Sequence, residues 1–378
     1  MKYILLVCLL ASSVLTGYSS PVDSLEQVLK TAKGDLKVKT LNELFRSHIN
    51  SVPVKAIGYA REALTLATEI DDRKGMAASY NNLGVAYKSQ GALDKSLEYY
   101  LTALKIYTNL KNKDGVATLK SNIGTIYSIK KDYGQAMKYF EESYQEFSEI
   151  GEQPKVIFAM NNLGNLHSEL QLYEQALKYF SQASQLSQKA GRLYSDPINN
   201  IGNLYFKQGN YQRAVGYYEK ALVLAIKENN QLTVLNIMAN MGEVYARAGQ
   251  GVKAQHYLDS AVILSKQLQA YVYEPTILKS MAYNYAKQNK MKEAYEVMVQ
   301  YDLAKEKVYG EESSRKIAQM EIAMDLQEKE KEVESLKKED KIKSLELRNT
   351  RMIVSLAGLG LVALISLANF IYQRKKNK

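Results

Sequence analysis

Five asparagines recur at nearly constant spacing through the middle of the chain. They are Asn82, Asn122, Asn162, Asn200 and Asn240, and they lie 40, 40, 38 and 40 residues apart. An asparagine side chain both donates and accepts hydrogen bonds, so it can pair with a peptide backbone whatever side chains the peptide carries. One such bond contributes only about 1 kcal/mol net, but five in a row would matter. The spacing indicates a ladder of amides that could pair with a peptide backbone.

More polar side chains accompany this ladder. The candidate binding residues beyond the five are Asn161, Asn165, Asn199, Asn203, Lys207 and Arg247, with Lys88 nearby. The basic members could hold a carboxylate of the ligand, or they could lie on a solvated face. For the asparagines, a second interpretation stays open, in which they only bridge neighbouring helices.

Other chemistry finds little support in the residue types. The histidines His48, His167 and His256 are isolated from one another and from cysteine, so their spacing predicts no metal site. Cys8 is the only cysteine, which leaves no basis for disulfides in the mature chain. The sequence shows no nucleophile elbow and no phosphate-binding loop. Gly358 and Gly360 lie inside the apolar C-terminal segment and cannot form such a loop. We expect neither catalysis nor a cofactor.

The ladder belongs to a longer repeat of about 40 residues. An apolar–small pair recurs at Leu83-Gly84, Ile123-Gly124, Leu163-Gly164, Ile201-Gly202, Met241-Gly242 and Met281-Ala282. An aromatic residue or histidine follows three positions later, a small residue twelve later, and a large residue sixteen later. This pattern predicts two antiparallel helices that cross closely at the small residues, with the large side chains filling the space between pairs. Gly91, Gly209 and Gly249 are predicted to end helices.

The pattern L-G-x-x-Y, followed by A, F and A on a second helix, resembles the tetratricopeptide repeat, in its 40-residue bacterial signalling variant. Five repeats match well, and a degenerate unit fits residues 35–71, with Leu44 in place of the glycine. The resemblance implies an all-α, right-handed superhelix of six to seven helix pairs over residues 35–309. It also implies that the asparagine two residues before each glycine faces the concave groove, where related proteins contact peptides.

The N-terminus resembles a secretory signal. Lys2 precedes an apolar stretch over residues 4–15, and Gly17 and Ser19 suit a cut after residue 19. Lipidation at Cys8 is disfavoured by its position inside the apolar stretch. A lead-in helix is expected over residues 20–34.

The C-terminal part predicts a stalk and one membrane crossing. Residues 310–350 are rich in Glu and Lys without Gly or Pro beyond Gly310, which favours a long helix, either as a homodimeric coiled coil or alone. The span assigned to residues 351–373 includes the 21 uncharged, mostly apolar residues 352–372, about 31 Å of helix. The basic tail at residues 374–378 indicates the cytoplasmic side, so the repeats would be periplasmic on a bacterial inner membrane.

The net charge of +10 is spread through the chain, and no basic patch indicates nucleic-acid binding. The whole arrangement resembles the input half of bacterial membrane histidine kinases or helix-turn-helix regulators, without the output domain. We therefore expect a membrane-anchored interaction module that acts as the input part of a sensor or adaptor, with a signalling partner in the membrane or cytoplasm. A passive envelope scaffold and a truncated or split sensor are the alternatives.

Overall fold

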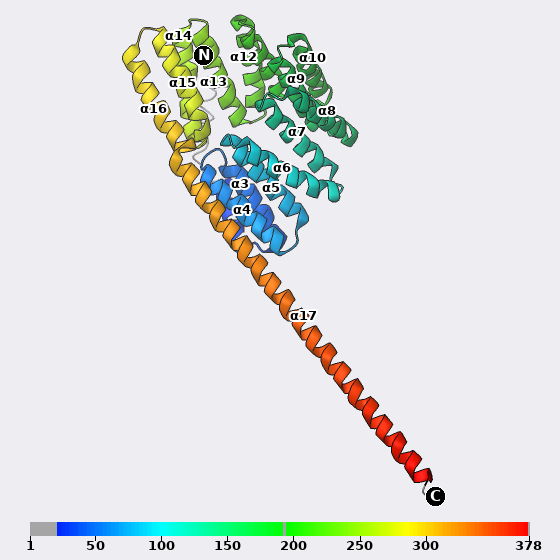
Figure 1. The fold of residues 1–378 in the computed structure, drawn as a ribbon. Helices are drawn as coiled ribbons and strands as arrows, with labels where there is room; N and C mark the ends of the chain where they lie inside the picture. Colours follow the sequence, from blue (N-terminus) through cyan, green and yellow to red (C-terminus); the bar gives the residue numbers. More distant parts are fainter. Residues whose placement is uncertain (1–20, 192–193, 377–378) are drawn as a thin grey trace. The chain divides into compact units, whose positions relative to one another are not determined.

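The computed structural model describes residues 21–191 and 194–376, and these residues form helices without a strand. The predicted signal peptide lies outside the described residues. The helices follow one another as antiparallel pairs, as Figure 1 shows, so the all-α repeat fold expected from the sequence is confirmed. The chain divides into two compact units, residues 1–314 and 315–378.

The paired helices alternate between a first and a second member. The first helices are α3 (Gly34–His48), α5 (Arg73–Ser89), α7 (Lys113–Ile129), α9 (Gln153–Glu169), α11 (Ser195–Lys207), α13 (Gln231–Arg247) and α15 (Glu274–Lys287). The second helices are α4 (Pro53–Glu69), α6 (Leu93–Asn109), α8 (Tyr133–Ile150), α10 (Tyr173–Lys189), α12 (Tyr211–Lys227), α14 (Gly251–Gln267) and α16 (Met291–Tyr309). A 3-10 turn, η2 (Tyr271–Tyr273), precedes α15.

A left-handed residue ends helices throughout the array. The predicted glycines Gly91, Gly209 and Gly249 have φ of 78°, 75° and 75°. Equivalent turns use Lys111 and Asn229 instead, at φ of 54° and 55°. The next helix then begins with a side-chain cap at several places. Capping oxygens are supplied by Asp72, Asn112, Asp132, Asn210 and Asn230, and each such cap stabilises its helix by about 1 kcal/mol.

The repeated glycine lets an aromatic ring lie directly on the first helix. A Cβ added to Gly124 would sit 2.7 Å from the Phe140 ring, and one added to Gly202 would sit 2.6 Å from the Tyr218 ring. Both distances are shorter than real Cβ contacts allow, so only glycine fits. The predicted close crossing is therefore present. At the crossing of α5 and α6, Ser96 Oγ also donates a hydrogen bond to the carbonyl of Gly84 at 2.6 Å.

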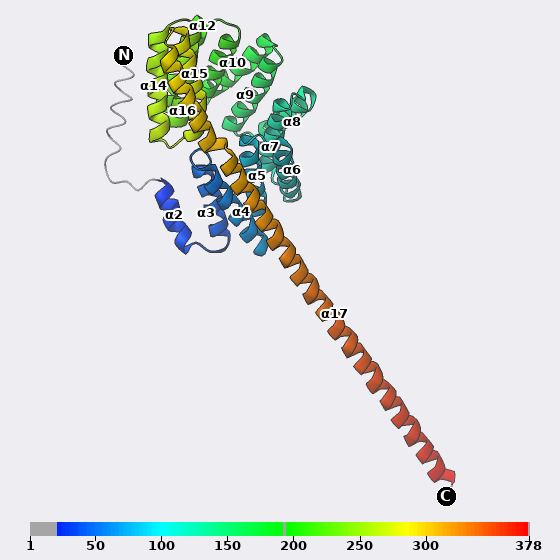
Figure 2. The same cartoon turned by 60° about the vertical axis from the view of Figure 1, so that its left-hand side comes forward.

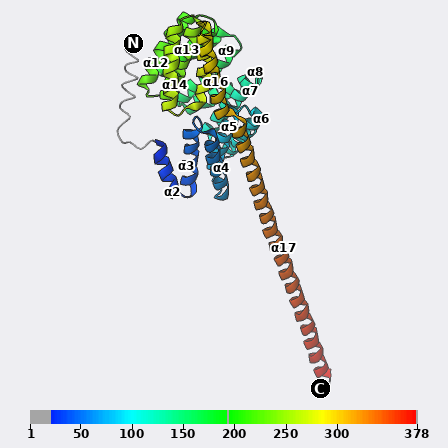
Figure 3. The same cartoon turned by 90° about the vertical axis from the view of Figure 1, so that its left-hand side faces the viewer.

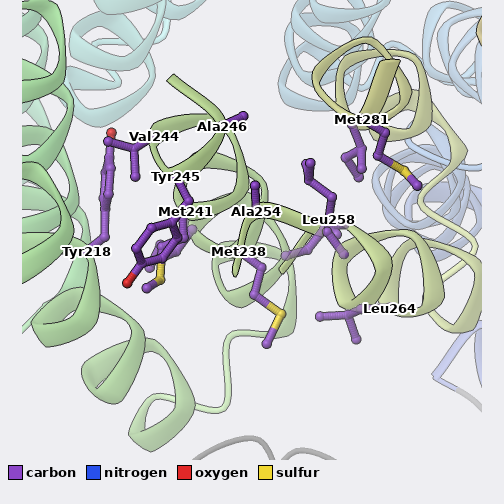
Figure 4. Close-up of a cluster of buried hydrophobic side chains, with 14 of the residues drawn as sticks. Tyr218, Met238, Met241, Val244, Tyr245, Ala246, Ala254, Leu258, Leu264 and Met281 are labelled. Atoms are coloured by element: carbon purple, nitrogen blue, oxygen red, sulfur yellow. The ribbon is translucent and has the colours of Figure 1, made fainter. Parts of the chain in front are cut away.

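The same rings also pack on the first helix of the following pair. Phe180, on α10, is buried with Ile201 and Leu204 of α11. Figure 4 shows the corresponding cluster further along, where Tyr218 of α12 lies near Met241 and Val244 of α13. Each pair therefore buries its apolar face on the next, as expected for a repeat that has no single central core.

A second contact between rings lies within the five pairs from α5 and α6 to α13 and α14. The residue three after the glycine stacks on a tyrosine of the second helix, for example Tyr127 on Tyr139 at 5.6 Å between ring centroids. His167 takes this place in α9: its Nδ1 lies 2.8 Å from the Leu163 carbonyl, and its ring is 5.1 Å from Tyr179. This histidine therefore packs in the place that a tyrosine takes in the neighbouring pairs. Among the described residues, no group of three His, Cys, Asp or Glu side chains could hold a metal.

Two helices flank the paired array in the chain. The first is α2 (Pro21–Thr31), which packs beside α3 (Figure 2) and places Leu29 against Val38 and Leu41. The second is α17 (Glu311–Lys376), a single helix of 66 residues that Figure 3 shows without interruption. It therefore has no break between the segments assigned to stalk and span.

Candidate functional site

Each first helix from α9 to α13 carries a stripe of polar residues around its ladder asparagine. On α9 the stripe includes Asn162, Asn165 and Glu169 at i, i+3 and i+7. The same three positions hold Asn200, Asn203 and Lys207 on α11, and Asn240, Glu243 and Arg247 on α13. Residues at these spacings share one face of a helix. Three neighbouring helices therefore present three parallel stripes.

Four of the five ladder asparagines donate a hydrogen bond to the first helix of the preceding pair. The side-chain Nδ2 donates from Asn82 to Asn42 Oδ1 (2.7 Å), from Asn122 to Asn81 Oδ1 (2.8 Å), from Asn162 to Ser121 Oγ (2.7 Å) and from Asn240 to Asn199 Oδ1 (3.4 Å). This geometry matches the second interpretation left open by the sequence, in which the asparagines bridge neighbouring helices. Contact between these four side chains and a peptide stays a prediction.

Asn200 departs from that rule. Its side chain makes no hydrogen bond among the described residues, although Asn161 stands on the preceding first helix at the corresponding place. The Oδ1 of Asn161 is buried and lacks a hydrogen-bond partner within the same part of the chain. The bridge that links the other first helices is therefore missing between α9 and α11.

The missing bridge coincides with a local irregularity of the repeat. The spacing from Gly164 to Gly202 is 38 residues rather than 40, and α11 has 13 residues where α9 and α13 have 17. The start of α11 is held elsewhere: the backbone N–H and the hydroxyl of Ser195 both donate to Glu228, at 2.8 and 2.7 Å. The shortened helix is thus fixed to the end of α12.

A cleft of about 320 Å³ opens at this irregularity, between α9, α11 and α13. It is lined by Asn165, Ser168, Glu169, Phe180, Asn200, Asn203, Phe206, Lys207, Tyr218, Asn240 and Glu243. Five of these belong to the predicted site: Asn165, Asn200, Asn203, Lys207 and Asn240. Tyr218 donates to Asn203 Oδ1 at 2.7 Å, and Asn240 Nδ2 reaches the same oxygen at 3.3 Å. The carbonyl of Asn203 is therefore engaged, whereas the amide of Asn200 is open to a ligand.

Of the other predicted residues, Asn162 and Arg247 lie on helices that border the cleft, Asn122 is half-buried on α7, and the remaining three are buried. Asn161 and Asn199 are 6% and 9% exposed, so both belong to the packed wall between first helices. Asn82 is only 2% exposed, at a distance of several repeats from the cleft in sequence. The structure thus brings five of the eleven predicted residues together and leaves Asn82 as an interior bridge.

The basic residues near the cleft have acidic partners. Lys207 Nζ lies 2.6 Å from Glu169 on the neighbouring first helix, and Arg247 lies 3.4 Å from Glu243 on its own helix and 4.5 Å from the Tyr283 ring centroid. Both pairs are largely exposed, so each contributes little to stability. Their effect here is to balance charge: a ligand carboxylate would have to displace Glu169 or Glu243.

Lys88, further toward the N-terminus, differs from these two. It is half-buried on α5 and has no ion-pair partner among the described residues, and burial lowers the pKa of its ammonium group. It does not line the cleft.

Sequence reasoning missed several lining residues. Glu169 lies seven residues after Asn162 and Glu243 three after Asn240, so helical spacing from the ladder was a usable signal for both. Phe180 and Tyr218 were assigned to packing, and they do fill that role while their edges border the cleft. Asn42, which accepts from Asn82, lies 40 residues before it and two before Leu44 in the degenerate first unit, so the repeat spacing was a usable signal for it as well.

Comparison with known proteins identifies the repeat type. The model of the tetratricopeptide repeat family matches residues 53–109, 115–189 and 193–267, more than half of the chain. No curated protein sequence matches.

Solved structures with the same fold share little sequence. The Rap conjugation gene regulator of plasmid pLS20, in complex with the Phr* peptide, is 17% identical over 78% of this chain and 80% of its own, with a TM-score of 0.53. Aspartyl phosphate phosphatase F from Bacillus subtilis is 17% identical over 76% and 75%, with a TM-score of 0.52. A Rap protein complexed with Competence and Sporulation Factor is 13% identical over 79% and 92%, with a TM-score of 0.51. At these identities the likeness concerns the fold.

Proposed function

Because this chain belongs to the tetratricopeptide repeat family, we propose that it binds an extended peptide segment in the cleft between α9, α11 and α13. The observation that carries the proposal is the missing bridge at Asn200. The protein itself uses the side-chain N–H of the four other ladder asparagines, whereas Asn200 lines the cleft and its side-chain N–H has no partner among the residues that the structure describes. A repeated interaction that is interrupted only where a cleft opens is a plausible site for a ligand to complete it.

The chemistry of the cleft favours recognition of the peptide backbone. Asn200 and the exposed Asn165 each offer a donor and an acceptor, which match the N–H and C=O of an extended chain. Lys207 is already paired with Glu169, so the cleft carries little unbalanced charge to select acidic or basic ligands. A Rap regulator with a similar fold was solved in complex with a peptide, which is consistent with a ligand of this class.

Backbone recognition can be tested without knowing the natural ligand. Random ten-residue peptides would be selected for binding to the full chain purified in detergent. Each backbone nitrogen of a selected peptide would then be methylated in turn. We expect one or two adjacent methylations to weaken binding at least about fivefold, because each removes a peptide N–H that donates to a side-chain oxygen of Asn200 or Asn165. Binding that depends on peptide side chains and is indifferent to every methylation would contradict the proposal.

We further propose that α17 anchors this module in a membrane with the repeats outside the cytoplasm, where the module acts as a sensor or adaptor. Within the described residues, α17 is the helix long and apolar enough to span a bilayer, judged by length and composition. The basic residues beyond the apolar segment support the orientation.

Two experiments separate these parts of the proposal. Protease added to spheroplasts should digest the repeats, and full protection would refute their export. A pulldown from solubilised membranes should recover a kinase or regulator in a peptide-dependent manner. A constant set of envelope proteins would instead support a passive scaffold.

A further inference from the structure

The helix α17 exposes large apolar side chains where the charged segment meets the apolar one. Ile342 and Leu345 are 57% and 43% exposed, and Met352, Leu356 and Leu359 are 55%, 62% and 67% exposed. In the water-facing part of α17, before residue 351, Ile342 and Leu345 are uncovered apolar side chains that a partner helix would bury. The stripe that they begin continues through Met352, Leu356 and Leu359 into the apolar segment.

The stripe has the spacing of a coiled-coil seam. The residues at alternating intervals of three and four are Ile342, Leu345, Asn349, Met352, Leu356 and Leu359. These intervals place all six on one face of an α-helix, in the a and d positions of successive heptads. The opposite face, through Val333, Leu336 and Leu347, is interrupted by Asp340 and Lys343. The seam is therefore the more continuous apolar face.

We infer that this seam, residues 342–359, pairs in parallel with the same seam of a second copy of this chain. The charges beside it suit that occupant. In a parallel pair, Lys341 of one helix faces Glu346 of the other, since these positions lie five residues apart at g and e. The two-fold axis makes this opposite-charge contact twice.

Asn349 fixes how the two helices align. It occupies an a position between Leu345 and Met352, where an asparagine finds a hydrogen-bonding partner only in the identical residue of a second helix in the same register. An asparagine at this place favours two strands over three or four. It also lies next to the apolar segment, where an unpaired amide would be costly.

The pairing ends on the N-terminal side of Ile342. The preceding seam positions are Ser335 and Lys338, which are unsuited to a buried interface. Lys338 instead lies 2.8 Å from Glu334 of its own helix, and Lys343 lies 2.7 Å from Glu339. Such i,i+4 pairs support an isolated helix. The inferred dimer is thus confined to residues 342–359, and it does not require the groove to bind a peptide.

Cysteine cross-linking tests the seam directly. In the full chain with Cys8→Ala, single cysteines would replace Ile342, Leu345 or Asn349 on the seam and Lys343, Leu347 or Thr350 off it. Ile342 and Leu347 form a matched pair because both are 57% exposed in the single helix. Oxidation would be carried out in detergent and in membranes of the expressing cells.

We expect disulfide-linked dimers of twice the chain mass at the three seam positions, at least fivefold more than at the three others. Mixing with a cysteine-free copy should lower the yield. Equal cross-linking at all six positions, no dimer at any, or adducts with other proteins would overturn the inference. The variant Asn349→Leu gives a second readout: it should retain association but populate larger oligomers, and an unchanged dimer would argue against the assigned register.

Discussion

Asn82 and Asn200 occupy the same place in the repeat and have opposite surroundings. Asn82 is 2% exposed, and its Nδ2 donates to Asn42 Oδ1 at 2.7 Å, with Ser79 in the same network. Asn200 is only half-buried, lacks a side-chain hydrogen bond among the described residues and lines a cleft. One residue type at one repeat position thus serves as an interior bridge in one pair and as an open donor in another.

The difference teaches that repeat position alone does not determine function. What matters is whether the preceding first helix presents an acceptor at the right place. Asn42, Asn81, Ser121 and Asn199 do so. Asn161 does not, at the point where α11 is shortened and the repeat loses two residues.

The largest effect is expected at Gly202, the repeat glycine two residues after Asn200. Gly202→Ala would force a Cβ to 2.6 Å from the Tyr218 ring, and overpacking of this kind costs about 1–3 kcal/mol of unfolding free energy. Gly216→Ala, on α12 of the same pair, is the matched control because nothing lies within 4 Å of its added Cβ. That variant should be neutral or more stable by about 0.5–1 kcal/mol.

Urea unfolding followed by circular dichroism would measure both variants. A Gly202→Ala protein as stable as Gly216→Ala would mean that the close crossing does not hold the cleft in place.

A smaller effect is expected at Asn82, whose amide is hydrogen-bonded within the protein. Asn82→Ala removes a buried hydrogen bond and leaves a small void, so the free energy of unfolding should fall by about 1–2 kcal/mol. Asn200→Ala removes no bond within the described residues and should change stability by less than about 0.5 kcal/mol. Thermal unfolding compares the two variants. Equal losses of unfolding free energy in the two variants would show that Asn82 and Asn200 do not differ in the way described.

The smallest effect concerns α13, the far wall of the cleft. Burial, together with neighbouring Tyr257 and Glu219, raises the pKa of Tyr245 to about 12. The folded protein therefore holds this proton more tightly than the unfolded chain, whose tyrosines titrate near pH 10. The associated stability is fully present below pH 10 and is lost as the pH rises toward 12.

Tyr245→Phe has no phenolic proton, so its stability should fall less between pH 9 and pH 11, by about 1 kcal/mol. Urea unfolding at the two pH values gives the comparison. An identical pH dependence in both proteins would show that the folded state does not perturb this tyrosine.

The repeat fold was predictable because its causes lie at fixed spacings. Gly124 and Phe140 are sixteen residues apart in the sequence and meet in the structure, and the turn at Gly91 follows from the preference of glycine for positive φ. The turn at Lys111 was not predictable in this way, because lysine carries no such preference and the flanking helices impose the conformation.

The site was predictable only in part. The period identified the asparagines, and helical spacing placed Asn165 and Asn203 near them. The acceptor of each amide was not predictable, because it depends on how neighbouring helices rotate relative to one another. The 38-residue spacing before Gly202 was visible in the sequence, but its consequence for Asn161 and Asn200 required coordinates.

The central claim is that Asn200, and not the whole series of five asparagines, binds the peptide. The most direct measurement is the Kd of a selected peptide for wild type, Asn200→Ala and Asn82→Ala, by isothermal titration calorimetry at a temperature where all three are folded. We expect Asn200→Ala to weaken binding about fivefold, the loss of one hydrogen bond of about 1 kcal/mol, and Asn82→Ala to leave Kd unchanged. Equal Kd values for wild type and Asn200→Ala, or an equal loss in both variants, would contradict the account.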